Sequence, residues 1–167
     1  MDAEDILEDA FGRLPELVST AVEGLSPDQL RWSPRKGANT VGWLVWHLTR
    51  VQDSHLTELI GGEQVYLSGE WAPRFGLKPD PDDTGYAHTA DQVAAVAPES
   101  AQVLLDYYAA VHERTLTYLR GLTAADLDRV VDENWDPPVT LGVRLVSVYD
   151  DDAQHAGQAA YVRGLLS

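Results

Sequence analysis

The stretch D-D-D-A-Q-H-A-G-Q-A-A-Y-V-R-G-L-L, residues 150–166, belongs to a helix whose residue pattern indicates a helical bundle. From residue 141 onward, one face of this helix repeats at alternating steps of four and three residues, which is typical of the buried face of a bundle helix. The residues on this face are Leu141, Leu145, Val148, Asp152, His155, Ala159, Val162 and Leu166. Asp152 and His155 lie on this face, and Asp151 lies about 100° away at its edge. Because a buried carboxylate without a partner is costly, the polar cluster needs an explanation.

Three other segments have helical periodicity, at about residues 5–23, 40–60 and 98–121. The last helix is expected to begin near Thr140 and to run to the end of the sequence. Pro15 lies inside the first segment, where proline removes a backbone hydrogen bond, so we expect this helix to be kinked or split. Short capped turns are expected at residues 27–30 and 123–126.

A long crossover is expected between the second and third long helices. Residues 61–98 contain several prolines and glycines and an acidic run at residues 80–83, which predict an irregular connection. A faint internal repeat relates Thr40-x-Gly42 to Thr140-x-Gly142, each before a long helix. We therefore predict an all-α fold in which two helical hairpins form one four-helix bundle, in a single domain spanning residues 1–167.

Composition excludes several classes of function. The formal net charge of −15 at pH 7 repels phosphate backbones, so we expect no nucleic-acid partner. The absence of cysteine excludes disulfides, thiolate ligands and a cysteine nucleophile. The N-terminus does not resemble a signal peptide, and no apolar run approaches the roughly 20 residues that span a bilayer. We expect a cytoplasmic protein with no membrane partner.

The polar cluster of the last helix has three interpretations. Asp151 and His155 are four residues apart, so their side chains meet on one face of the helix. They could be a core histidine beside an acidic patch, an ion pair, or two ligands of a divalent metal ion. A metal site needs a third ligand from another helix, and spacing alone favours His47 and His55 equally, because both lie on or beside the apolar face of the second helix.

A family resemblance distinguishes these two histidines. Trp46-His47-Leu48, together with Asp151-x-x-x-His155-x-Gly157-Gln158, resembles the pattern of the DinB-like superfamily. This superfamily includes bacillithiol- and mycothiol-dependent transferases and the mycothiol-dependent maleylpyruvate isomerase. The resemblance implies a four-helix bundle with a long crossover between helices 2 and 3, and metal ligands at His47, Asp151 and His155. It also points to zinc or nickel.

One position departs from the family pattern. The first ligand of the last helix is more often His or Glu in the family, whereas this chain has Asp151, which is shorter than Glu by one methylene. Asp152, three residues before His155, is the alternative carboxylate ligand, while Asp150 is expected to point away. Two imidazoles and one carboxylate leave coordination positions open, as in catalytic metal sites.

The resemblance implies a metal-dependent enzyme that activates a low-molecular-weight thiol, such as mycothiol, for transfer to a small electrophilic substrate. The alternative is a non-catalytic metal- or ligand-binding bundle that can form a homodimer. Gln158 could orient His155 or simply be a polar surface residue. Arg144 is expected to pair with an acidic residue rather than to bind an anionic ligand. Trp43 and Trp46 are expected in the core, with a pocket beside the metal as the alternative.

Overall fold

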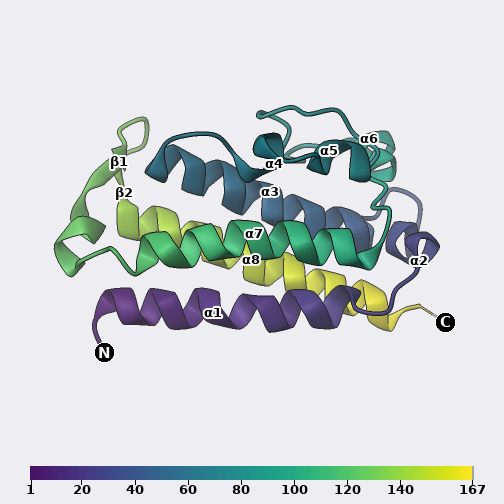
Figure 1. The fold of residues 1–167 in the computed structure, drawn as a ribbon, viewed down its shortest axis with the longest axis horizontal. Helices are drawn as coiled ribbons and strands as arrows, with labels where there is room; N and C mark the ends of the chain where they lie inside the picture. The colour runs from purple at the N-terminus through teal and green to yellow at the C-terminus, as the bar shows by residue number, and fades with distance from the viewer. Residues whose placement is uncertain (167) are drawn as a thin grey trace.

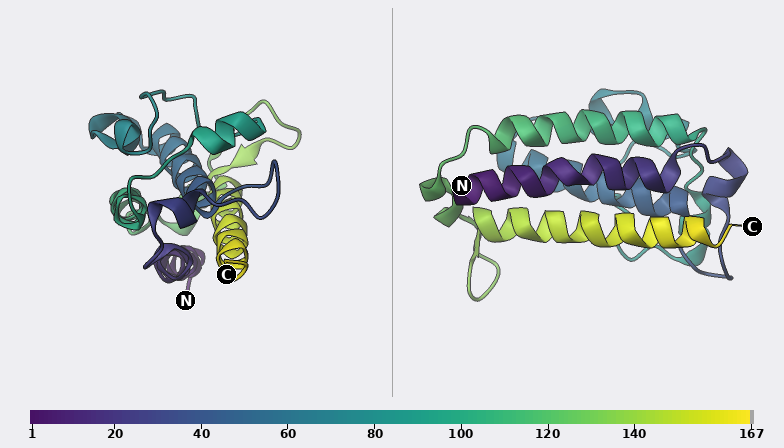
Figure 2. Two further views of the ribbon diagram at one scale, coloured as in Figure 1. Left: turned by 90° about the vertical axis from the view of Figure 1, so that its right-hand side faces the viewer. Right: turned by 90° about the horizontal axis from the view of Figure 1, so that it is seen from below.

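The computed structural model describes residues 1–166. Four long helices form a bundle (Figure 1). These are α1 (Ala3–Val22), α3 (Val41–Ile60), α7 (Ala101–Leu119) and α8 (Leu141–Gly164). Helix α8 packs against α3 and α1, and α7 packs against the same two helices. Seen from below in Figure 2, α1 lies between α7 and α8. This arrangement confirms the predicted all-α bundle.

Local capping explains where the long helices begin and end. The Thr40 hydroxyl accepts a hydrogen bond from the Trp43 amide at 3.0 Å, and Ser100 and Thr140 cap α7 and α8 in the same way. Gly61 ends α3 with a φ of 85°, in the left-handed region that favours glycine. These signals are local in sequence, and the observed ends lie within a few residues of the predicted ones.

Of the two outcomes expected at Pro15, a kink or a split, the split is wrong, because α1 is one continuous helix from Ala3 to Val22. Phe11, Leu14 and Val18 surround the proline and are all fully buried. Their packing against the other helices stabilises the helical path on both sides of Pro15, and this outweighs the lost backbone hydrogen bond.

The directions of α3 and α7 explain why the crossover between them is long. Helices α3 and α7 run the same way along the bundle (Figure 1), so the chain between them must return along its whole length. The crossover is more ordered than predicted and contains three short helices, α4 (Val65–Ser68), α5 (Trp71–Arg74) and α6 (Ala90–Ala95). Buried Asp53 holds its first part, because its carboxylate accepts hydrogen bonds from the amides of Val65 and Tyr66 at 2.9 and 2.8 Å.

The remaining elements are short and lie near the ends of the bundle. They are α2 (Pro27–Arg31), the 3-10 helix η1 (Ala124–Asp128), and the strands β1 (Val130–Asp132) and β2 (Val139–Thr140), which form an antiparallel hairpin. The hairpin was not predicted, because its strands are too short to produce a visible alternation. No helix within residues 1–166 is long and apolar enough to cross a membrane.

Candidate metal centre

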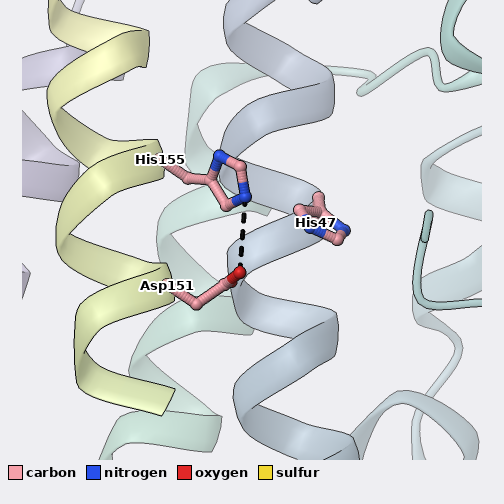
Figure 3. Close-up of side chains that lie close together, drawn as sticks. All are labelled: His47, Asp151 and His155. Atoms are coloured by element: carbon pink, nitrogen blue, oxygen red, sulfur yellow. Dashed lines mark ion pairs between the residues drawn. The ribbon is translucent and has the colours of Figure 1, made fainter. Parts of the chain in front are cut away.

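The structure brings His47, Asp151 and His155 together at the seam between α3 and α8 (Figure 3). One ligand atom from each residue lies within 4.8 Å of the others. The α3 helix supplies His47, and α8 supplies the other two side chains on successive turns. His55, the alternative third ligand, is elsewhere, with its Nδ1 2.8 Å from the Arg144 guanidinium.

His47 is held with its Nε2 free. Its Nδ1 donates a hydrogen bond to the Thr84 carbonyl oxygen, which can only accept, so Nδ1 carries the proton. Trp43 stacks on the ring, with centroids 4.6 Å apart and planes 11° from parallel. Burial lowers the pKa of His47, because the charged imidazolium is poorly solvated there. The side chain is therefore a neutral imidazole whose unprotonated Nε2 can bind a metal.

His155 is oriented in the same manner from the other helix. Its Nδ1 lies 2.9 Å from Gln158 Oε1, which accepts the hydrogen bond, and its Nε2 faces Asp151. The structure thus supports the orienting role of Gln158 over a simple surface role. The Asp151 carboxylate raises the pKa of His155 and outweighs the opposing effect of burial.

Asp151 has the features of an unsatisfied ligand. Its Oδ1 lies 3.5 Å from His155 Nε2, longer than the 2.7–2.9 Å or so of a charge-assisted hydrogen bond. Its Oδ2 is buried and has no hydrogen-bond partner among residues 1–166. Two ligand atoms about 2.1 Å from a tetrahedral ion are roughly 3.4 Å apart, so the observed spacing fits a shared cation. The shorter carboxylate of aspartate still reaches the cluster.

The three consecutive aspartates have different environments. Asp152 is fully buried, and neither of its carboxylate oxygens has a hydrogen-bond partner within the described residues. Burial, and then the nearby Asp151 charge, raise its pKa well above the ordinary value. It faces the bundle interior and is not one of the three clustered residues. Asp150 points outward, where it accepts a hydrogen bond from Gln154 at 2.7 Å.

A pocket of about 390 Å³ lies one helical turn from Asp151. Its walls include Ser147 and Arg144 of α8, His55 of α3, and Trp135 of the β1–β2 loop. Arg144 pairs with Asp132 at 3.0 Å, as predicted for an acidic partner. Burial, followed by the Arg144 charge, lowers the pKa of His55. The pocket therefore combines polar groups with an exposed aromatic wall, one helical turn along α8 from Asp151, and its lining includes none of the three clustered residues.

Two predictions about the surrounding residues are decided by burial. Trp46 is fully buried and Trp43 nearly so, which confirms their place in the core, although Trp43 also contacts His47. Sequence reasoning missed Thr84, which contributes only a backbone carbonyl. No side-chain pattern could reveal such a role.

Comparisons with known proteins agree with this architecture. The sequence profile of the DinB superfamily matches residues 10–159. The chain belongs to the DinB superfamily. A relative from Geobacillus thermodenitrificans, named "Putative metal-dependent hydrolase", is 30% identical over an alignment of 134 residues that covers 77% of this chain and 67% of the relative.

A solved structure supports the same assignment. The crystal structure of a conserved protein from Enterococcus faecalis superposes on this DinB chain with a TM-score of 0.88 and 32% sequence identity. The superposition covers 98% of this chain and 96% of the other. The resemblance inferred from the two histidine motifs is thereby confirmed, as is the DinB-like bundle fold.

Proposed function

We propose that this DinB protein is a metal-dependent enzyme whose divalent ion is held by His47, Asp151 and His155. One observation carries the proposal: each imidazole donates its Nδ1 proton to a protein oxygen, which leaves both Nε2 atoms unprotonated, and the ligand atoms of the two histidines and Asp151 lie within 4.8 Å of one another. Fixing the tautomer through the second nitrogen is the usual way in which proteins orient metal-binding histidines. The metal-dependent name of the Geobacillus relative supports the same reading.

The donor set suits zinc or nickel, which both accept imidazole and carboxylate ligands. An ion bound there supplies Lewis-acid chemistry, because it lowers the pKa of a thiol or a water molecule in its open position. The Asp151 Oδ2 atom, which has no donor among the described residues, is a free acceptor within the cluster for the proton that the nucleophile releases. We propose that Asp151 holds this proton while the nucleophile attacks.

A low-molecular-weight thiol, such as mycothiol, is the proposed nucleophile, and a small electrophile is its target. The pocket lined by His55, Trp135, Arg144 and Ser147 has a volume of about 390 Å³, which suits a small molecule. Its polar side chains can bind a carbonyl or carboxylate group, and Trp135 can cover an apolar part of the substrate. The reaction joins the thiol sulfur to the electrophilic carbon and releases the leaving group with a proton.

Hydrolysis is the second candidate function, because the Geobacillus relative is named as a hydrolase. The same three residues could serve it with water in place of the thiol. The two reactions differ in their requirement for a thiol, so one pair of assays separates them.

The test uses protein loaded with zinc, and with Co²⁺ as a spectroscopic substitute. Mycothiol and N-acetylcysteine are added, and near-ultraviolet absorption of the Co²⁺ protein reports whether the thiol sulfur binds the ion. Product formation is then measured with monobromobimane in the presence of thiol, and with p-nitrophenyl acetate in its absence.

Wild-type protein is expected to show the absorption band and thiol-dependent product formation above the uncatalysed rate. His155→Ala should abolish both, whereas His112→Ala, which changes a buried histidine outside the cluster, should preserve both. Hydrolysis without thiol would favour the second candidate. Metal binding with neither reaction would leave a non-catalytic metal-binding bundle and contradict the enzyme proposal.

A further inference from the structure

Arg50 is a fully buried cation on α3, three residues after His47. Its guanidinium donates to the backbone carbonyls of Asp80 and Pro81, each at 3.1 Å, and to that of Asp83 at 2.9 Å. It also binds Gln64 Oε1 at 2.7 Å. A buried arginine costs much free energy to desolvate. Here most of its donors are used to hold one short segment of the crossover.

That segment leads directly to the metal centre. The carbonyl after the one bound by Arg50 belongs to Thr84, and it accepts the Nδ1 proton of His47. Arg50 and His47 lie on neighbouring turns of one helix face, so two consecutive carbonyls are bound from the same rigid element. Because neighbouring residues are linked by planar peptide groups, fixing the Asp83 carbonyl restricts where the Thr84 carbonyl can lie.

The crossover segment that contacts His47 has little freedom to move. The Asp83 carboxylate accepts from the Gly85 amide at 3.1 Å and lies 2.7 Å from His88 Nε2. Gly85 has a φ of 88°, and a Cβ placed there would lie 2.9 Å from His47 Nδ1. The backbone therefore passes so close to the imidazole that only glycine fits at this position.

We propose that Arg50 is a positioning residue for the metal centre: by binding the carbonyls of residues 80–83, it places the Thr84 carbonyl that fixes the His47 tautomer. This inference rests on the proposed function for its biological meaning. The physical claim concerns the metal-free protein and can be tested there.

Arg50→Lys is the informative substitution, because it keeps the positive charge near Asp53, which lies 3.7 Å from the arginine. A single ammonium group cannot reach the spread of oxygens that the guanidinium binds. Asp53 keeps its hydrogen bonds to Val65, Tyr66 and Tyr107, so the start of the crossover stays anchored.

Arg114→Lys is the matched control. Arg114 also ties the crossover to the bundle, through Thr57 Oγ1 at 2.9 Å and the carbonyls of Gly61 and Glu63 at 2.7 and 2.9 Å. These contacts do not lead to His47. Loss of crossover contacts in general affects both variants, whereas loss of the His47 tautomer is expected in Arg50→Lys alone.

The experiment records long-range ¹H–¹⁵N spectra of the imidazoles in metal-free protein, with circular dichroism as a check of the fold. In wild type and Arg114→Lys, His47 is expected as the Nδ1-protonated tautomer. In Arg50→Lys, the Nε2-protonated form should become populated, while His155, which is held by Gln158, should not change. The zinc affinity of Arg50→Lys should fall by roughly 10–100-fold, as for other supports of metal ligands.

An unchanged His47 tautomer and an unchanged zinc affinity in folded Arg50→Lys would overturn the proposal. If that variant does not fold, Gly85→Ala replaces it, because the added methyl must displace the segment from His47. It is then expected to alter the His47 tautomer in the same way, and an unaltered tautomer would refute the positioning role. If the tautomer changes as predicted but wild type binds no metal, the proposed function fails and the positioning role stands.

Discussion

Asp152→Asn is expected to stabilise the protein at neutral pH. The wild-type carboxyl is fully buried, and neither oxygen has a hydrogen-bond partner within residues 1–166. Asparagine has nearly the same shape and carries no charge that must be buried. Because Asp152 is outside the cluster of His47, Asp151 and His155, the variant should also bind zinc as wild type does.

The size of the effect depends on pH in a defined direction. Burial raises the pKa of Asp152 in the folded protein above the ordinary value of 3.8. At pH values between the ordinary pKa of the unfolded chain and the raised pKa of the folded protein, the folded state holds one proton more than the unfolded state. The free energy of unfolding of wild type therefore falls as pH rises through this range. The limiting slope is about 1.4 kcal/mol per pH unit for a single group. Asp152→Asn lacks this titration, so its advantage should grow with rising pH and disappear in acid.

Thermal unfolding followed by circular dichroism, in EDTA and at a series of pH values, measures the difference. For a chain of this size, about 1.4 kcal/mol corresponds to roughly 3–6 °C in Tm. Asp150→Asn is the control, because Asp150 is exposed and its substitution should change the free energy of unfolding by less than about 0.5 kcal/mol. An Asp152→Asn advantage that is independent of pH, or that grows as pH falls, would contradict a raised pKa of Asp152 in the folded protein.

Three further outcomes are expected. Gln158→Leu should weaken zinc binding by roughly 10–100-fold in a chelator competition, because His155 loses its orienting acceptor, whereas Gln154→Leu should bind as wild type does. Zinc at about 100 times its Kd should stabilise the protein by about 2.7 kcal/mol, or roughly 5–10 °C in Tm, and His47→Ala should show no such shift in calorimetry. Zinc affinity should decrease on acidification, since Asp151 raises the pKa of His155 and the ion must displace that proton; an isothermal titration series that shows constant affinity from neutral to acidic pH would contradict this.

Signals that are local in sequence predicted much of the fold. Thr40, Ser100 and Thr140 each cap a long helix, and their hydroxyls bind amides three residues away, so the helix starts are readable without tertiary information. The sequence did not predict that the crossover is well structured. Its structure depends on buried Arg50 and Asp53, which bind partners more than ten residues away in sequence. Nor does propensity reveal that packing keeps α1 continuous at Pro15.

For the candidate site too, local spacing could be read from the sequence, whereas the relative placement of two helices could not. Asp151 and His155 meet because they are four residues apart on one helix, which the sequence alone determines. His47 and His55 are two turns apart, about 12 Å along α3, and the choice between them depends on how α3 and α8 are aligned. The structure places His55 beside Arg144 and leaves His47 opposite His155, an alignment that was inferred only through the family resemblance.

The most direct test of the account is the metal content of untagged protein, measured by elemental analysis beside His155→Ala and the control His112→Ala. About one zinc or nickel ion per chain is expected in wild type and in His112→Ala, and none in His155→Ala. If wild type holds no metal even after zinc or nickel is added, Asp151 and His155 are an ion pair, and the metal centre proposed here does not exist.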